Sequence, residues 1–362
     1  MALDDYYLLG RSGLRVSRLA LGTMNFGTAG FHAPYGKTED DASAIFSTYV
    51  EAGGNFIDTA DFYTAGESER ILGKLMTGMR DRMVLTTKAT NSIDHSDPNA
   101  GGNSRKHLIR ALDASLRRLG TDYVDLFLLH TWDRITPVDE VLRTFDDLTR
   151  AGKIRYAGLS DVPSWYAARA QSLADAHGLP PMINLQLPYS LVERTIETEH
   201  VPMAQDLGLG ITAWSPLAGG FLTGKYRRDD QGLNGDGRLA GDGTPGWTWN
   251  DRQWGLLATI KEVADKLGVT MAQVAVNWAA TQPGIAAAIV GASRPEQLAT
   301  SIQALEFEIP AELRSALDEA SAVPPESVYR MFTPQYQSWI VTPGAKVADK
   351  PAGYQPPVLN WR

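Results

Sequence analysis

Four polar residues stand at the ends of short apolar segments, or in the loop after one, and together they could transfer a proton. They are a carboxylic acid, a phenol, an amine and an imidazole: Asp58, Tyr63, Lys88 and His130. Apolar segments of this length are typical of buried β-strands. Polar groups at the ends of parallel strands meet at one rim of the sheet, where α/β proteins bind ligands. The sequence therefore predicts an enzyme.

These four residues suit the reduction of a carbonyl group. A phenol has a pKa of about 10, and a neighbouring ammonium lowers that value. We expect Lys88 to supply this charge to Tyr63, while Asp58 keeps Lys88 charged and oriented. Tyr63 would then protonate a carbonyl oxygen that His130 hydrogen-bonds. Because no serine or cysteine nucleophile with a partner base is evident, hydride from a nicotinamide cofactor fits best.

The elements that position these residues repeat as strand–helix units. Eight strand candidates centre near Leu19, Phe56, Val84, Phe127, Tyr156, Ile183, Ile211 and Ala288. The segments between them are amphipathic: Asn103 and Ser104 can cap a helix that Gly120 ends, and residues 139–150 form another. Eight such units favour an α/β fold of the (β/α)8 TIM-barrel type over an open sheet.

Three regions fall outside this repeat. Residues 6–16 predict a hairpin that could plug the bottom of the barrel, away from the site. Residues 221–251 contain many glycines and few apolar side chains, which indicates a long loop. We expect one barrel domain at residues 1–323 and an irregular C-terminal tail at residues 324–362, packed on the barrel near the active-site mouth.

The composition argues against several functions. The chain of 362 residues has a net charge of -8, which argues against a nucleic-acid partner. It has no cysteine and its six histidines are scattered, so we expect neither disulfides nor a metal site. The first residues lack a signal-peptide pattern, and no apolar stretch approaches the ~20 residues of a membrane span. We expect a soluble, cytoplasmic protein.

Two glycine-rich stretches imitate a dinucleotide-binding fingerprint. Residues 241–246 fit the pattern G-x-G-x-x-G, and residues 235–240 fit its looser form. Neither stretch follows a predicted strand or opens a predicted helix, which is the context that this fingerprint requires. We therefore interpret both as loop.

Several motifs give the chain a resemblance to a known family. They are residues 22–27 (GTMNFG), 55–60 (NFIDTA) followed by Tyr63, 66–69 (GESE), 87–88 (TK), 122–130 (DYVDLFLLH) and 152–160 (GKIRYAGLS). From about residue 10 to residue 305 the sequence resembles the aldo-keto reductases, particularly the branch of bacterial aryl-alcohol and sugar reductases and potassium-channel β subunits. The resemblance implies that the four residues described above form the family's catalytic tetrad.

A cofactor site follows from position and from the same resemblance. Residues 214–220 close the seventh strand, where barrels commonly bind phosphate, and their N–H groups with Lys225 could hold a pyrophosphate. The resemblance implies that Trp214 stacks on the nicotinamide while Ser160 and Gln186 bind its carboxamide. The expected cofactor residues are Thr23, Met24, Ser160, Asp161, Gln186, Trp214, Ser215, Leu217, Gly219, Lys225, Gly291, Ser293, Arg294, Gln297 and Ser301.

The choice of cofactor depends on residues 291–297. This segment opens a helix whose N-terminus suits an anion. Many members of the family have a Lys before the Ser and an Arg further on, where this chain has Ala292 and Gln297. Arg294 is the remaining cation for a 2′-phosphate, so we expect NADP(H), with NAD(H) as the alternative. Near the nicotinamide, Asp161 replaces the family's usual Asn and alters one expected hydrogen bond.

Aromatic side chains in the predicted loops and tail indicate the substrate. The candidates for the pocket walls are Phe26, Phe31, Trp132, Tyr336 and Trp339, with Tyr35, Trp247 and Trp249 beside them. This number of aromatic side chains at the predicted pocket entrance suggests that the substrate is a bulky or ring-containing carbonyl, or the corresponding secondary alcohol. The expected partner is therefore a small molecule, and the protein is expected to be a monomer or a homo-oligomer.

Three functions fit these observations. The leading hypothesis is an NADPH-dependent carbonyl reductase that also works in reverse as an alcohol dehydrogenase. The first alternative is a dehydrogenase that acts mainly on a sugar or a ring-containing secondary alcohol. The second is a cofactor-sensing interaction protein similar to the channel β subunits, with little turnover and an exposed apolar assembly surface.

Overall fold

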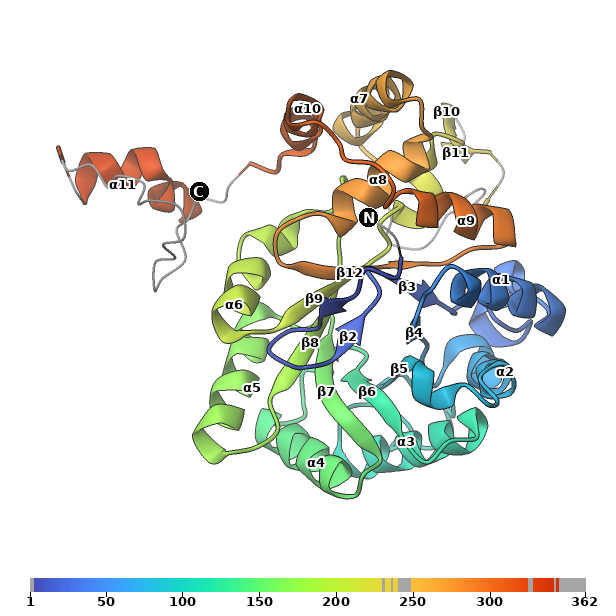
Figure 1. The fold of residues 1–362 in the computed structure, drawn as a ribbon. Helices are drawn as coiled ribbons and strands as arrows, with labels where there is room; N and C mark the ends of the chain where they lie inside the picture. Colours follow the sequence, from blue (N-terminus) through green and yellow to red (C-terminus); the bar gives the residue numbers. More distant parts are fainter. Residues whose placement is uncertain are drawn as a thin grey trace.

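Eight parallel strands close into a barrel that helices surround (Figure 1). The computed structural model describes residues 3–229, 232–235, 237–239, 249–324, 328–341 and 343–344. The barrel strands are β3 (Leu19–Gly22), β4 (Phe56–Asp58), β5 (Val84–Ala89), β6 (Val124–Leu129), β7 (Ile154–Ser160), β8 (Met182–Pro188), β9 (Gly210–Trp214) and β12 (Ile285–Val290). Each predicted strand centre lies within one of these strands. The predicted (β/α)8 barrel is confirmed.

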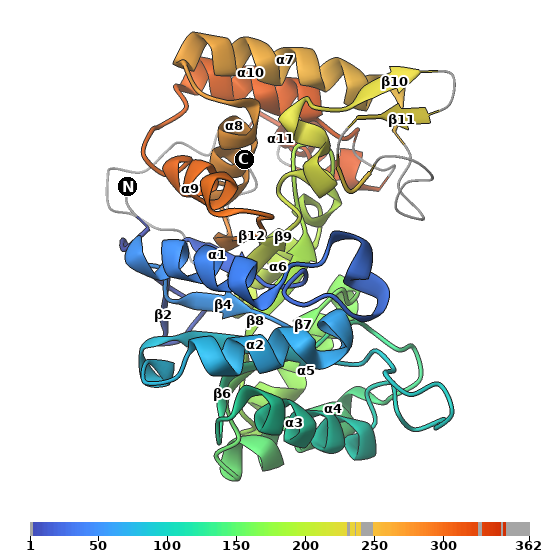
Figure 2. The same cartoon turned by 90° about the vertical axis from the view of Figure 1, so that its right-hand side faces the viewer.

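Helices cover the outside of the barrel. The α-helices are α1 (Glu39–Glu51), α2 (Glu67–Leu75), α3 (Arg105–Leu119), α4 (Val138–Arg150), α5 (Ser164–His177), α6 (His200–Leu207), α7 (Asp251–Leu267), α8 (Met271–Ala280), α9 (Pro295–Gln303), α10 (Ala311–Ser321) and α11 (Pro334–Ile340). The 3₁₀-helices are η1 (Gly30–Tyr35), η2 (Tyr63–Gly66), η3 (Arg80–Arg82), η4 (Thr195–Glu197), η5 (Ala218–Thr223) and η6 (Tyr329–Phe332). Figure 2 shows α7 and α10 side by side outside α8.

The ends of α3 and α4 follow from local chemistry. In α3 the Ser104 side chain accepts a hydrogen bond from the His107 N–H, and Gly120 ends the helix with a left-handed φ of 62°. Helix α4 begins one residue earlier than expected, after Pro137, whose φ of -60° already matches a helix entry. Both helices place an apolar stripe against the barrel, as their periodicity predicts.

The N-terminal hairpin closes the bottom of the barrel. Its strands β1 (Tyr7–Leu8) and β2 (Arg15–Val16) are antiparallel. Leu9 is fully buried among the side chains that fill the barrel interior. Gly10 has a φ of 56°, and a Cβ there would lie 2.3 Å from the Ile183 carbonyl oxygen at the start of β8. The predicted plug is thus confirmed, and it leaves the opposite end of the barrel for the site.

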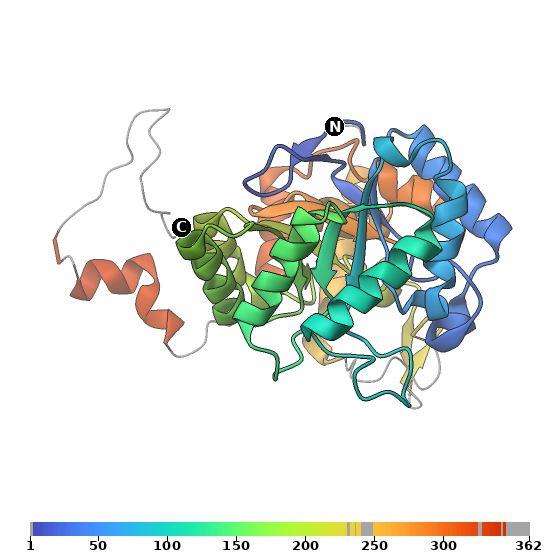
Figure 3. The same cartoon turned by 90° about the horizontal axis from the view of Figure 1, so that it is seen from below.

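The two other irregular regions differ in form. The glycine-rich region after η5 contains a second antiparallel hairpin, β10 (Arg227–Asp229) with β11 (Gly232–Asn234). Beyond α10, the tail contains η6 and α11, and Figures 1 and 3 show α11 outside the ring of barrel helices. The Tyr329 hydroxyl donates to the Glu199 carboxylate next to α6. Residues 241–248 and 345–362, which include Trp247 and Trp361, lie outside the described residues.

Tyr49 joins α1 to the barrel and offers a test of this packing. Its fully buried hydroxyl lies 2.7 Å from the Leu19 carbonyl oxygen and 2.9 Å from that of Phe56, and it accepts from the Phe56 N–H at 3.1 Å. Tyr49→Phe removes the hydrogen bonds of this hydroxyl to buried backbone groups, so it is expected to lower the free energy of unfolding by about 1–3 kcal/mol in urea denaturation.

Tyr6→Phe is the matched control. The Tyr6 hydroxyl donates to the Gly53 carbonyl at 2.8 Å but is exposed, so water replaces the lost contact. The expected change is within about 0.5 kcal/mol. Equal effects of the two variants would contradict the role given to the buried hydroxyl.

Candidate active site

The four catalytic candidates meet at the carboxyl end of the barrel. Asp58 ends β4, Lys88 lies next to the end of β5, and His130 follows β6 directly. Strands β4, β5 and β6 are neighbours, so their ends bring these side chains to one rim. Tyr63 opens η2, the turn after β4. The structure thus brings together the four residues that the sequence singled out.

A buried ion pair organises this cluster. Lys88 is fully buried, and its Nζ donates to Asp58 Oδ1 and to the Thr59 carbonyl oxygen, both at 2.7 Å. It also donates to the Tyr63 hydroxyl at 3.3 Å. The second Asp58 oxygen accepts from the Gln186 side-chain amide at 2.7 Å. An ammonium has three N–H donors, and the protein supplies an acceptor for each.

Burial and proximity determine the charges of this cluster. Burial lowers the pKa of Lys88, but the Asp58 carboxylate and the Tyr63 oxygen outweigh burial and raise that pKa above its ordinary value. Burial raises the pKa of Tyr63, and the Lys88 ammonium lowers it by less. The effect of the ammonium was predicted from the sequence, whereas the larger effect of burial was not. The free protein therefore keeps the phenol protonated, which is the form of a general acid.

His130 is a neutral imidazole beside the phenol. Burial and the Lys88 ammonium lower the pKa of His130 well below its ordinary value. Its ring meets the Tyr63 ring edge to face, with centroids 5.6 Å apart. Its backbone N–H donates to the Ala89 carbonyl at 3.0 Å, and its buried Nδ1 has no partner among the described residues. A neutral imidazole can donate one hydrogen bond.

A strained turn presents Tyr63. Thr64 and Ala65 have left-handed φ values of 46° and 54°, which cost free energy for non-glycine residues. The Thr64 hydroxyl donates to the Phe26 carbonyl at 2.6 Å and accepts from the Ser68 N–H at 3.0 Å. These bonds tie η2 to the loop after β3 and to α2, so the surrounding structure maintains the strained backbone.

His32 also lines the site beside Tyr63, and it was not among the residues predicted from the sequence. It lies in η1, is 2% exposed, and its ring centroid is 5.5 Å from that of Tyr63 and 5.2 Å from that of Phe62. Burial lowers the pKa of His32 to about 4, so the ring is neutral, and its Nδ1 accepts from the Thr64 N–H at 3.3 Å. A single His in a loop belongs to no periodic pattern; only the fold brings η1 against η2.

The residues expected at the nicotinamide lie together and hydrogen-bond one another. Asp161 Oδ1 accepts from the Trp214 indole N–H at 2.9 Å, and the Asp161 N–H donates to the Gln186 carbonyl at 3.1 Å. Ser160 is buried at the end of β7. Burial raises the pKa of Asp161 to about 6. Asp161 therefore orients the Trp214 ring, a contact that the sequence did not reveal.

The two segments expected to bind the phosphates follow β9 and β12, and they differ from each other in conformation. After β9, Ser215 and Gly219 have φ values of 59° and 66°, and the Gly219 N–H donates to Ser215 Oγ at 3.2 Å. Lys225 follows η5 and is exposed. After β12, Arg294 is the N-cap of α9, with a side chain that is 69% exposed and 3.9 Å from the Glu296 carboxylate. Two exposed cations thus flank this rim, which fits a phosphorylated cofactor.

Other predicted cofactor residues support the scaffold. The Thr23 hydroxyl is fully buried and donates to the Asp58 carbonyl at 3.0 Å. Gln297 Oε1 accepts from the Ser293 N–H at 2.9 Å, and the Ser301 hydroxyl donates to the Gln297 carbonyl at 3.1 Å. The remaining candidates lie in the loops after β3, β9 and β12: Met24, Leu217 and Gly291. Their contacts with a cofactor stay predictions.

The residues predicted for the substrate pocket are dispersed. Phe26 is fully buried, whereas Phe31 is 73% exposed and meets His32 edge to face at 5.2 Å. Trp132 lies in the loop after β6 and lines a separate pocket. On α11, Tyr336 and Trp339 contact each other with centroids 6.0 Å apart, and Trp339 is 72% exposed. A role for α11 at the mouth stays a prediction.

Two features are absent from the described part of the chain. None of its helices combines the length and apolar character needed to cross a membrane. The same residues contain no group of three acidic or histidine side chains arranged to hold a metal ion.

Comparison with known proteins defines the class. The pattern of the Aldo/keto reductase family matches residues 18–322, and the chain belongs to this family. The family and its oxidoreductase members support carbonyl reduction as the general chemistry.

Particular relatives differ in what their names describe. The Uncharacterized oxidoreductase YrpG of Bacillus subtilis is 37% identical over 87% of this chain and 95% of its own length. The Putative voltage-gated potassium channel subunit beta of Schizosaccharomyces pombe is 33% identical over 90% of this chain and 96% of its own. The Norsolorinic acid reductase stcV of Emericella nidulans is 32% identical over 94% of this chain and 90% of its own.

Asp61, beside the site, makes stability depend on pH. Its carboxyl group is 1% exposed, Oδ1 has no partner among the described residues, and burial with the nearby Glu69 raises its pKa to about 8. An unfolded Asp releases its proton near the ordinary value of about 3.9. Folding therefore takes up a proton between these pH values, and Asp61 costs progressively more stability as the pH rises toward 8.

Asp61→Asn removes this titration. At pH 4 the two proteins are expected to have similar free energies of unfolding, because Asp61 is protonated in the folded state. At pH 8.5 the Asn variant is expected to exceed the wild-type protein by at least about 1 kcal/mol, as one pKa unit corresponds to about 1.4 kcal/mol. Urea denaturation across this pH range measures the difference, and a constant difference would contradict the assignment.

Proposed function

We propose that this protein reversibly reduces an aldehyde or ketone to the alcohol with NADP(H), and that Tyr63 is the general acid. The contact that carries the proposal is the buried Lys88 ammonium at 3.3 Å from the Tyr63 hydroxyl, with Asp58 at 2.7 Å on its other side. This arrangement suits a phenol that must lose a proton inside a protein, because the fixed positive charge favours the phenolate.

Three side chains of this protein have separate roles in the proposed reaction. When bound, the dinucleotide supplies hydride to the carbonyl carbon. Tyr63 gives its proton to the carbonyl oxygen as that oxygen gains charge, and Lys88 stabilises the resulting phenolate. The neutral His130 donates a hydrogen bond to the same oxygen and sets its angle. In the reverse direction the phenolate takes the proton of the alcohol.

A ring-containing substrate is favoured. Near Tyr63 the walls are aromatic, because the Phe62 ring contacts the rings of His32 and His130, and both of these contact the Tyr63 ring. The name of the relative from Emericella nidulans describes a reductase of norsolorinic acid. An aryl aldehyde or ketone therefore suits the walls, and the corresponding secondary alcohol suits the reverse reaction.

Two other functions make different predictions. A dehydrogenase of sugars or ring-containing alcohols would use the same four residues, with the ratio of oxidised to reduced cofactor setting the direction. An interaction protein, as the name of the relative from Schizosaccharomyces pombe suggests, would bind cofactor but turn over slowly. A panel of carbonyls and alcohols with both cofactors separates these functions.

Tyr63→Phe tests the general acid. The variant keeps the ring but loses the proton, so reduction of an aromatic aldehyde is expected to slow by about 10²–10⁴-fold, the usual contribution of general acid catalysis. NADPH absorbance gives the rate, and fluorescence titration with NADPH is expected to show unchanged binding. Tyr123→Phe is the control, since this hydroxyl donates to Asp81 at 2.7 Å near the opposite end of the barrel. Equal activity in both variants would refute the proposed role.

Arg294→Ala tests the choice of cofactor. Loss of this guanidinium is expected to weaken NADPH binding by about tenfold or more, because a charge-assisted contact with the 2′-phosphate is removed. Binding of NADH, which lacks that phosphate, is expected to stay the same. Isothermal titration with each cofactor measures both. The same ratio of NADPH to NADH affinity before and after substitution would rule out Arg294 as the selective residue.

A further inference from the structure

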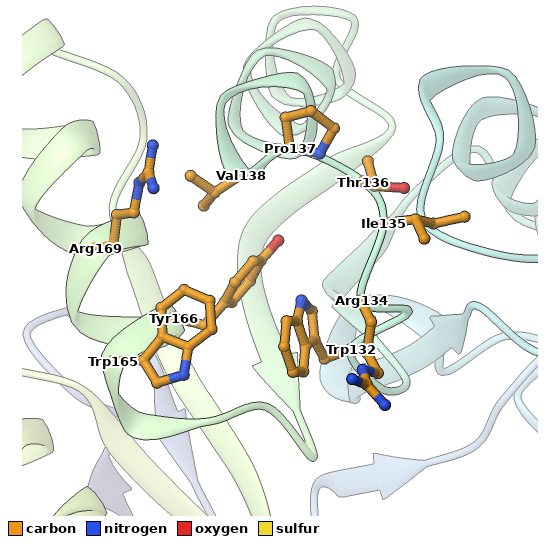
Figure 4. A pocket seen from close by; sticks show the side chains of 9 residues that line it. All are labelled: Trp132, Arg134, Ile135, Thr136, Pro137, Val138, Trp165, Tyr166 and Arg169. Atoms are coloured by element: carbon orange, nitrogen blue, oxygen red, sulfur yellow. The ribbon is translucent and has the colours of Figure 1, made fainter.

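A pocket of about 230 Å³ opens between the loop after β6 and the start of α5 (Figure 4). Trp132 and Trp165 meet there edge to face, with ring centroids 5.3 Å apart, and Tyr166 packs against both. We call this cavity the Trp132 pocket; its aromatic wall consists of Trp132, Trp165 and Tyr166. An apolar cavity of about 150 Å³ is enough to bind benzene. The Trp132 pocket therefore has room for one substituted aromatic ring.

The loop that forms one wall of the Trp132 pocket is held in place by hydrogen bonds before any ligand binds. The Asp133 carboxylate accepts hydrogen bonds from the N–H groups of Asn103, Ile135 and Thr136 and from the Thr136 hydroxyl, at 2.6 to 3.1 Å. Burial raises the pKa of Asp133, but these hydrogen bonds outweigh burial and lower it, so the carboxylate stays charged. A loop held in this way loses little entropy when a ligand binds.

One polar group points into the Trp132 pocket. Tyr166 is 2% exposed, and its hydroxyl has no hydrogen-bond partner among the described residues. Figure 4 shows this hydroxyl directed into the space between Val138 and Trp132. Burial raises the pKa of Tyr166 to about 12, so the hydroxyl remains a donor. A buried donor without an acceptor costs free energy, and a ligand oxygen would remove that cost.

The groups around this donor favour an anion. Arg169 borders the pocket, acts on the Tyr166 hydroxyl electrostatically and forms no salt bridge with an acid of the described residues. Arg134 lies over the Trp132 ring, and Figure 4 shows its guanidinium directed away from that hydroxyl. Helices α4 and α5 both begin there without a side chain that caps the N-terminus, and such ends carry partial positive charge. The acids nearby are Asp133, which its own loop engages, Asp139 and Glu140 in the first turn of α4, and Glu199, which accepts from the Ser164 hydroxyl at the start of α5. A flat aromatic wall and several donors together suit an aryl anion.

We propose that the Trp132 pocket binds an aromatic carboxylate, with the ring against Trp132 and Trp165 and the carboxylate at the Tyr166 hydroxyl, on the side of Arg169. The pocket lies outside the catalytic four, but Trp132 follows His130 by two positions and its N–H donates to the Asp161 carbonyl at 3.3 Å. The carboxylate can belong to an acidic aryl carbonyl substrate, which rests on the proposed function, or to a separate molecule. Both have the same recognition chemistry.

Titration calorimetry of the full chain with benzoate tests the site. Benzoate is expected to bind saturably, and more tightly than neutral benzamide or than acetate, which lacks the ring. Tyr166→Phe and Arg169→Gln are each expected to weaken benzoate binding by about tenfold or more, because each removes a hydrogen bond to a charged group. Arg143→Gln, on the exposed face of α4, is the control and leaves binding unchanged.

A further variant tests the aromatic wall. The Trp165 ring is 54% exposed, so Trp165→Ala is expected to fold, as checked by circular dichroism, and to weaken benzoate binding. Absence of saturable benzoate binding, or equal binding by the pocket variants and the control, overturns the proposal.

Kinetics identify the source of the carboxylate. If the carboxylate belongs to the substrate, benzoate competes with 4-carboxybenzaldehyde, and Arg169→Gln raises the KM for that aldehyde but not for benzaldehyde. If it belongs to a separate molecule, benzoate binds and both KM values stay the same in the variant. Calorimetry needs no turnover, so failure of the proposed reduction leaves the binding test intact.

Discussion

A buried ammonium is the constraint on which the site depends. Removing a lysine charge from water costs several kcal/mol, and an attraction between two charges offsets that cost only when the geometry is good and the remaining donors are satisfied. Lys88 meets these conditions, because Asp58, Thr59 and Tyr63 each accept one of its hydrogen bonds. The ammonium cannot move to water without leaving all three acceptors. The phenol of Tyr63 therefore sits beside a fixed positive charge.

The barrel supplies this arrangement through strand register. Asp58 pairs with Thr86 and Lys88 pairs with Leu128, so Lys88 lies two residues beyond the partner of Asp58 and His130 two residues beyond the partner of Lys88. This stagger follows the tilt of the barrel strands, and all three residues face the same rim. The hairpin fills the opposite end, which leaves one mouth for chemistry. Only Tyr63 comes from a turn, and the left-handed backbone after it is stabilised by bonds to the neighbouring loop.

The sequence predicted what local patterns determine and missed what three-dimensional contacts determine. Apolar runs that end in polar residues located Asp58, Lys88 and His130, and capping residues located α3. No pattern marked His32, because η1 reaches the site only through the fold. The Gln186 amide on Asp58 was missed for the same reason, since these residues are far apart in the chain. The tail had no periodicity from which its position could be predicted.

Charge balance explains why the other groups of the site are neutral. Asp58 and Lys88 already form a pair with no net charge, and a third buried charge would have no partner. Burial accordingly keeps His130 neutral and Tyr63 protonated in the free protein. When Tyr63 releases its proton, the new phenolate lies next to the ammonium, so the charge that appears during the reaction is the one that the site can stabilise. The neutral His130 adds a hydrogen-bond donor to the site and brings no further charge.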